Sequence, residues 1–92
     1  MGSYSLQIKP SAVRELEGLP TKRDRERVIA RIRTLAVDPR PSGCEKLPGL
    51  EDRYRVRQGA YRIVYSILDA ARIDAARIAT IVKVGHRKNV YR

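Results

Sequence analysis

The chain has 92 residues, a length that fits one compact domain with a modest core. Its 20 lysines and arginines outnumber its 10 aspartates and glutamates, and the formal net charge of +10 predicts a polyanion as partner rather than a merely basic surface. A single cysteine excludes an intramolecular disulfide, no Cys/His cluster has metal-ligand spacing, and no apolar run has signal-peptide or membrane-span length. We therefore expect one soluble, cytoplasmic domain over residues 1–92 that needs no cofactor and no membrane.

The N-terminal part of the chain predicts a strand and a short helix. Residues 4–9 alternate between apolar and polar side chains, which is the period of a half-buried strand. Ser11 is a plausible N-cap for a helix that carries Val13 and Leu16 at helical spacing and ends near Gly18.

A longer helix is expected after Thr21. Thr21 and Asp24 resemble a capping box, although Glu or Gln is the usual partner at the second position. One apolar stripe follows, with basic residues over the remaining surface; it consists of Val28, Ile29, Ile32, Leu35 and Ala36. The pair Asp38-Pro39 marks the end of this helix, and the Pro- and Gly-containing residues 40–52 predict a loop.

Residues 53–58 and 60–68 flank Gly59 like the arms of a β-hairpin. Alternation places Tyr54 and Val56 on one face of the first arm and its arginines on the other, namely Arg53, Arg55 and Arg57. Residues 69–73 are repeated directly as residues 74–78, which predicts a longer connection rather than a functional repeat. Residues 78–84, apolar on both faces, then predict a central strand.

The hairpin turn leaves three registers open. A Gln58-Gly59 turn sets Arg55 opposite Arg62, and a Gly59-Ala60 turn sets Arg57 opposite Arg62. Both arrangements are destabilising in the absence of an anion, whereas a three-residue turn sets Arg62 against Gln58. The functional interpretation is a phosphate site, and the structural one is a pair of arginines extended along a solvated sheet face.

The last ten residues gather cations, the only histidine and a near-terminal tyrosine without a carboxylate. Together with the hairpin arginines, this set fits RNA phosphodiester cleavage, in which a 2′-hydroxyl attacks the neighbouring phosphorus and charge grows on the phosphate oxygens. Arginine suits the phosphate but is a poor base, so His86 and Tyr91 are the candidates for proton transfer or nucleotide positioning. His86 could instead be merely exposed at a strand end, and Tyr91 could close the edge of the core.

Four motifs resemble the RelE/ParE toxin superfamily, and they are YRVR (54–57), GAYRIVY (59–65), VKVGHR (82–87) and VY (90–91). The resemblance implies an α+β fold in which two N-terminal helices pack on a small, mainly antiparallel β-sheet, and it makes the chain a toxin of a type II toxin–antitoxin module. RelE-like members cleave messenger RNA in the ribosomal A site without a metal, so the resemblance implies an endoribonuclease that inhibits translation.

By position in these motifs, Arg62 and Arg87 match the phosphate-stabilising arginines of the superfamily, and Tyr91 matches its C-terminal tyrosine. His86 holds the basic position before the second arginine and is our first candidate for proton transfer, with Tyr91 second. Arg55 and Arg57 stand where RelE proper carries lysines implicated in proton transfer, which leaves the base unassigned. The residues expected to bind RNA phosphates are Arg53, Arg55, Arg57, Lys83 and Lys88.

The partners that the resemblance implies are a cognate antitoxin, in a complex that could be a heterotetramer, and messenger RNA on the 30S subunit of the ribosome. Two other functions stay open. One is a ParE-like poison of DNA gyrase without ribonuclease activity, and the other is an inactive partner that only binds an antitoxin.

Overall fold

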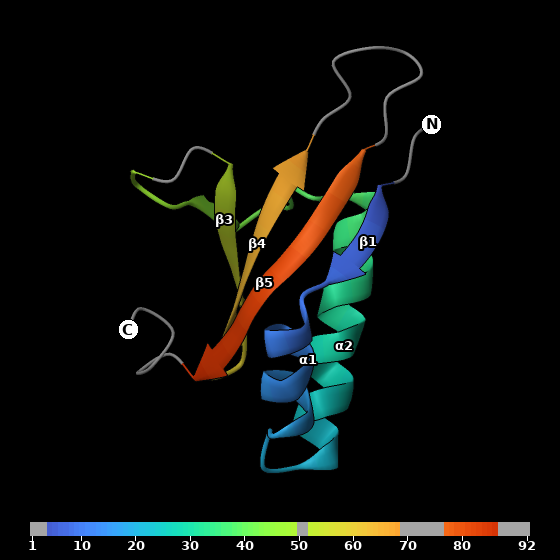
Figure 1. Ribbon diagram of the computed structural model, residues 1–92. Helices are drawn as coiled ribbons and strands as arrows, with labels where there is room; N and C mark the ends of the chain where they lie inside the picture. Colours follow the sequence, from blue (N-terminus) through green and yellow to red (C-terminus); the bar gives the residue numbers. More distant parts are fainter. Residues whose placement is uncertain (1–3, 50–51, 69–76, 87–92) are drawn as a thin grey trace.

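The computed structural model describes residues 4–49, 52–68 and 77–86, which form two helices and a five-stranded sheet (Figure 1). Along the chain these are β1 (Ser5–Ile8), α1 (Pro10–Glu17), α2 (Lys22–Val37), β2 (Glu45–Lys46), β3 (Arg53–Gln58), β4 (Tyr61–Leu68) and β5 (Ile78–His86). The strand order across the sheet is β1-β5-β4-β3-β2. β1 pairs with β5 in parallel and the other pairings are antiparallel. The expected α+β fold with a mainly antiparallel sheet is confirmed.

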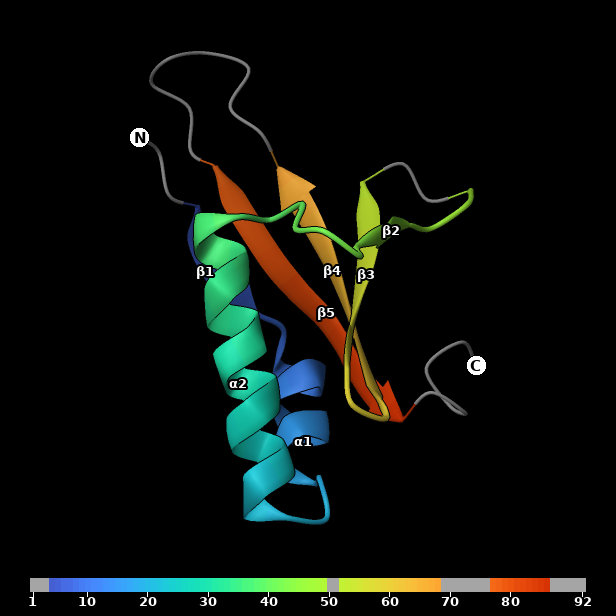
Figure 2. The same ribbon diagram turned by 180° about the vertical axis from the view of Figure 1, so that it is seen from behind.

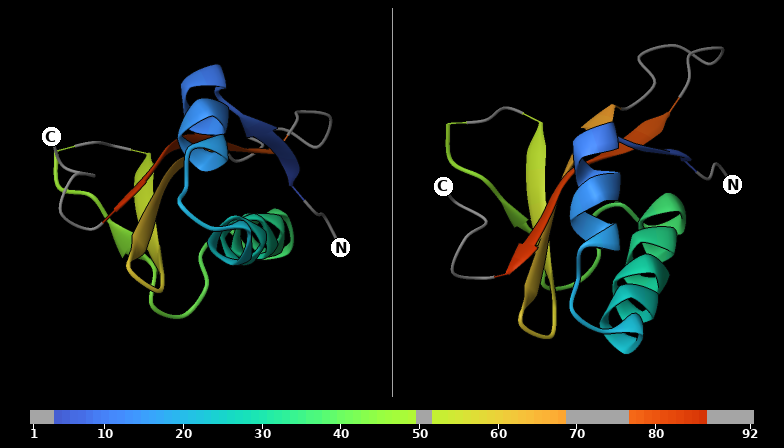
Figure 3. Two further views of the ribbon diagram at one scale, coloured as in Figure 1. Left: turned by 90° about the horizontal axis from the view of Figure 1, so that it is seen from below. Right: turned by 60° about the horizontal axis from the view of Figure 1, so that its bottom comes forward.

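The helices lie on one side of this sheet. α2 passes behind β1 and β5 in Figure 1 and in front of them in Figure 2, while α1 continues from β1 and packs beside the second half of β5 (Figure 3). One buried cluster joins both helices to β3, β4 and β5, and it includes Leu16, Val28, Ile32, Leu35, Val56, Ile63, Tyr65, Ile81 and Val84. Neither helix in the described part of the chain has the length and apolar character of a membrane-spanning segment.

α1 begins two residues earlier than the sequence suggests. Its N-cap is Lys9 and its first residue is Pro10, so the prediction of Ser11 as N-cap is wrong. Proline fits this position because the first helical N–H groups have no intrahelical partner to lose. Ala12 is buried with Leu16, whereas Val13, which the sequence groups with Leu16, is 36% exposed.

α2 begins and ends as expected. The Thr21 hydroxyl accepts a hydrogen bond from the Asp24 N–H at 3.0 Å, and Asp38 is the C-cap. Val28, Ile32 and Leu35 of the predicted stripe are buried, while its other two members are half-buried.

The segment expected to be a loop contains one short strand. β2 pairs antiparallel with β3, with Glu45 opposite Arg55 and Lys46 opposite Tyr54. Two residues are too few to leave a periodic pattern in a sequence, which is why β2 could not be predicted.

The β3–β4 hairpin adopts the register that a Gly59-Ala60 turn requires, with Gln58 opposite Tyr61 and Arg57 opposite Arg62. Gly59 has φ +60°, and no non-glycine residue of the described chain has positive φ. Positive φ at the first turn position alone is the pattern of a type II′ turn, which matches the twist of the two strands and favours glycine there.

A β-bulge interrupts the pairing of β4 with β5. Val64 lies opposite Lys83 and Tyr65 lies opposite Ile81, so Val82 is an extra residue in β5. The bulge reverses the alternation of side chains, so Val84 joins Ile81 in the core although the two are three positions apart.

Three expected site residues, Arg87, Lys88 and Tyr91, lie outside the described residues, as do residues 69–76 of the repeated segment. Their roles therefore stay predictions.

Candidate nucleic-acid interface

The hairpin arginines share the sheet face that is turned away from the helices. Core residues occupy the alternate positions of β3 and β4, so Arg53, Arg55, Arg57 and Arg62 project from the opposite side; we call these four side chains the arginine face. Within it, Arg57 and Arg62 are directly opposite each other on neighbouring strands. Gly85 lies opposite Arg62 on β5 and adds no side chain beside its guanidinium.

One carboxylate reaches this face from β2. Arg55 Nη2 and Glu45 Oε2 are 2.7 Å apart, and the Arg55 side chain is only 14% exposed, whereas that of Glu45 is 54% exposed. The Arg55 hydrogen bond and charge hold the pKa of the Glu45 carboxyl below its ordinary value, and the charges of Arg57 and Arg62 lower it further. Glu45 therefore stays ionised at neutral pH, close to three of the four arginines.

Two other cations expected to bind phosphate have acidic neighbours. Lys83 Nζ donates to Glu15 Oε2 on α1 at 3.0 Å, while Glu15 Oε1 accepts the Val84 N–H at 3.0 Å. Arg53 Nε lies 3.8 Å from Asp52 Oδ1 at the exposed end of the hairpin. The sequence does not reveal the pairing of Lys83, because Glu15 is distant along the chain.

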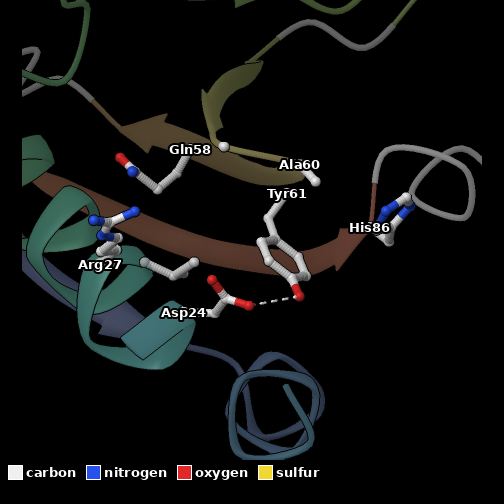
Figure 4. Close-up of a pocket in the computed structure, with 8 residues that line it drawn as sticks. Asp24, Arg27, Gln58, Ala60, Tyr61 and His86 are labelled. Carbon is white, nitrogen blue, oxygen red and sulfur yellow. Dashed lines mark hydrogen bonds between the residues drawn. The ribbon is translucent and has the colours of Figure 1, made fainter. Parts of the chain in front are cut away.

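The His86 imidazole lies on the other side of the sheet. Tyr61, directly opposite it on β4, contacts it edge to face, with 5.9 Å between ring centroids. The Tyr61 hydroxyl donates to Asp24 Oδ2 of α2 at 3.2 Å (Figure 4). Burial and then the Asp24 carboxylate raise the pKa of Tyr61, so its hydroxyl remains protonated at neutral pH.

A pocket of about 180 Å³ lies between α2 and the hairpin turn, and its lining includes Asp24, Arg27, Gln58, Tyr61 and His86 (Figure 4). The structure thus brings Arg53, Arg55, Arg57 and Arg62 together but does not bring His86 to them. The expectation that His86 converges with Arg62 is not met. The bulge at Val82 determines which face of the sheet each later side chain of β5 occupies, and it puts His86 on the face opposite to Arg62. Sequence reasoning also missed Glu45, for which the loop composition gives no signal.

No group of three or more His, Cys, Asp or Glu side chains that could hold a metal ion occurs among residues 4–49, 52–68 and 77–86. Cys44, the one cysteine, is half-buried and free.

Several solved structures have a similar fold. The toxin–antitoxin complex RelBE2 of Mycobacterium tuberculosis matches with 26% identity and a TM-score of 0.75, over 92% of this chain and 99% of that one. The intact RelBE complex of E. coli matches at 24% identity and TM-score 0.73, over 91% and 96% of the two chains. The RelB–RelE complex of Methanococcus jannaschii matches at 22% identity and TM-score 0.66, over 92% and 94%.

No curated protein sequence matches the chain. The family model described as the ParE toxin of the type II toxin–antitoxin system parDE matches residues 6–91, nearly the whole chain. The fold and this match agree with the motifs of the hairpin and of β5. The chain therefore belongs to the ParE toxin family of type II toxin–antitoxin systems, within the RelE/ParE superfamily.

Proposed function

We propose that this toxin is a metal-independent endoribonuclease that cleaves messenger RNA in the ribosomal A site and so inhibits translation. The observation that carries the proposal is the cross-strand pair of Arg57 and Arg62 on the sheet face turned away from α1 and α2. Two guanidinium groups held opposite each other repel, and a phosphodiester bound between them would offset that repulsion.

The arginine face supports the phosphate part of the chemistry. The proposed role of Arg62, which has Arg57 opposite it on β3, is to stabilise the charge that grows on the phosphate oxygens during attack by the 2′-hydroxyl. Proton transfer is assigned to Tyr91 before His86, since His86 packs against Tyr61 on the covered side of the sheet. Arg87 is proposed as the second phosphate-stabilising arginine, from its position in the motif.

The test is primer-extension mapping of a translated messenger after induction of the toxin. Arg62→Ala should lower cleavage by about 10²- to 10³-fold, the usual effect of removing one preorganised donor to a transition-state oxyanion. Arg87→Ala and Tyr91→Ala should each abolish growth arrest. Arg33→Ala is the matched control, because Arg33 is exposed on α2 and its loss lowers the net charge equally. Unchanged cleavage in Arg62→Ala would refute the site.

A cognate antitoxin is the proposed protein partner, since the three relatives above are toxin–antitoxin complexes. The +10 charge favours an acidic antitoxin segment, and the affinity should fall as salt rises.

A second candidate is a DNA-gyrase poison without ribonuclease activity. The family model that matches is that of ParE toxins, and His86 lies apart from the arginine face. Intact messenger in arrested cells, together with inhibition of supercoiling by purified gyrase, would favour this function over RNA cleavage.

A further inference from the structure

Glu45 is the acid whose carboxylate meets the arginine face most directly. It stands opposite Arg55 in the β2–β3 pairing, and its oxygen lies 2.7 Å from the Arg55 guanidinium. A carboxylate presents two oxygens to a guanidinium fork in the same way as a phosphate does. We propose that Glu45 competes with RNA phosphate for Arg55. In the unbound toxin the Glu45 carboxylate pairs with Arg55, and it releases the guanidinium when RNA binds.

The pair has the properties that such a competitor needs. Glu45 is ionised at neutral pH and its side chain is 54% exposed, so its carboxylate can move into solvent; the Arg55 side chain is only 14% exposed and therefore needs the incoming phosphate as its new partner. A phosphate that contacts several arginines forms more charge-assisted hydrogen bonds than the single Glu45 carboxylate does, so it can take the place of that carboxylate.

The position of β2 also allows the exchange. β2 has two residues and forms the outer edge of the sheet, where β3 is its sole strand neighbour. A hydrogen bond from the Leu47 N–H to the Arg53 carbonyl, 2.9 Å long, fixes the chain just after β2. The Glu45 side chain can therefore rotate away while the backbone of the edge strand stays paired.

The consequence is a toxin that binds free RNA less tightly than its arginine count suggests. Glu45 removes one charge from the face and occupies one guanidinium, so RNA must bring additional contacts to displace it. This inference rests on the proposed function and adds a competing contact within the same site.

The test compares binding and cleavage in Glu45 variants. Binding is measured by fluorescence anisotropy with a labelled, uncleavable 2′-O-methyl single-stranded RNA over a range of salt concentrations. Glu45→Gln should bind about fivefold more tightly, because RNA no longer competes with a carboxylate for Arg55, and its log–log salt slope should steepen by about 0.7. Glu45→Asp, which keeps the charge, should retain the wild-type slope.

Glu17→Gln is the matched control, because it changes the net charge equally from an exposed site on α1 and should leave the slope nearly unaltered. Equal affinity and slope for the Glu45→Gln and Glu17→Gln proteins would overturn the inference. So would a loss of messenger cleavage in Glu45→Gln with unchanged RNA binding, since Glu45 would then act as a proton acceptor.

Failure of the proposed function gives a different result. If Arg62→Ala neither weakens RNA binding nor reduces cleavage, the arginine face is not the RNA site, whatever Glu45 does. If Arg62→Ala has both effects but Glu45→Gln behaves like its control, the RNA site stands and only the competitor role fails.

Discussion

Glu15 and Glu45 each hold a cation that the sequence assigns to RNA. Glu15 binds Lys83 and also accepts the Val84 N–H, while Glu45 binds Arg55 on the arginine face. The difference between them lies in geometry: the Glu15 contact ties α1 to β5, whereas the Glu45 contact lies at an exposed sheet edge. We therefore expect Lys83 to contribute to stability and Arg55 to RNA binding.

Tyr65 gives a residue-scale prediction about stability. Its fully buried hydroxyl donates to the Pro39 carbonyl at 2.6 Å. Tyr65→Phe leaves that carbonyl without its partner, which should lower the free energy of unfolding by about 1–3 kcal/mol in urea titrations. Tyr54→Phe is the control, because the Tyr54 hydroxyl meets Arg40 at an exposed site and its loss should cost about 0.5 kcal/mol or less.

The stability difference between the wild-type protein and Tyr65→Phe should also depend on pH. Burial first, and then Cys44, raise the pKa of Tyr65 above its ordinary value of 10.0. A raised folded-state pKa stabilises the protein fully below the pKa of the unfolded chain and loses that contribution as pH rises. The advantage of wild type over Tyr65→Phe should thus shrink above pH 10, and an advantage that grows with pH would contradict the assignment.

At the residue scale the sequence predicts the arginine face but not what surrounds it. Alternation along β3 places Arg53, Arg55 and Arg57 together, as the structure confirms. The sheet face that His86 occupies could not be predicted in the same way. One bulged residue, Val82, reverses the alternation of side chains between the two faces for the rest of β5. Glu45 was hidden for another reason: its pairing is set by the path of a loop, which no local pattern encodes.

At the scale of elements, strong local signals predicted the long helix and the hairpin. Thr21 caps α2. The hairpin turn has the register in which Gly59 adopts the positive φ. The start of α1 was misjudged because Pro10 can occupy the first helical position, which makes a side-chain cap at Ser11 unnecessary. β2 forms by pairing with β3 and has little propensity of its own.

The cap of α2 can be tested directly. Thr21→Ala removes the acceptor for the Asp24 N–H and should lower the free energy of unfolding by about 1 kcal/mol. Thr34→Ala, in the same helix, should be neutral or slightly stabilising, since the Thr34 hydroxyl bonds back to the Arg31 carbonyl and alanine favours the helix. Chemical denaturation of both variants is the measurement, and equal losses would argue against a capping role.

At the scale of the whole molecule, the two sides of the sheet have separate tasks. One side buries the core under α1 and α2, and the other carries the arginine face. Pattern and charge predicted this division, because hydrophobic and basic residues alternate along the hairpin. The docking of α1 against the end of β5 depends on Glu15 and was not predictable, since it joins segments from opposite ends of the chain.

Glu15→Ala tests that docking. The Val84 N–H and Lys83 lose their shared acceptor, so the free energy of unfolding should fall by about 1–2 kcal/mol, less than for a fully buried bond because the group is partly exposed. Glu17→Ala, at an exposed position of the same helix, should change it by less than about 0.5 kcal/mol. The measurements are thermal and urea unfolding. If both variants showed the same small loss of unfolding free energy, Glu15 would have no role in docking α1.

The parallel pairing of β1 with β5 has a consequence for synthesis of the toxin. Ser5 lies opposite Ile78 and Ile8 opposite Ile81, so the first strand made completes the sheet only with the last. A nascent chain on the ribosome cannot close its sheet until residues up to β5 have emerged, and contacts so distant along the chain form late in folding. The toxin therefore acquires the β1–β5 pairing only after residues up to β5 have left the ribosome.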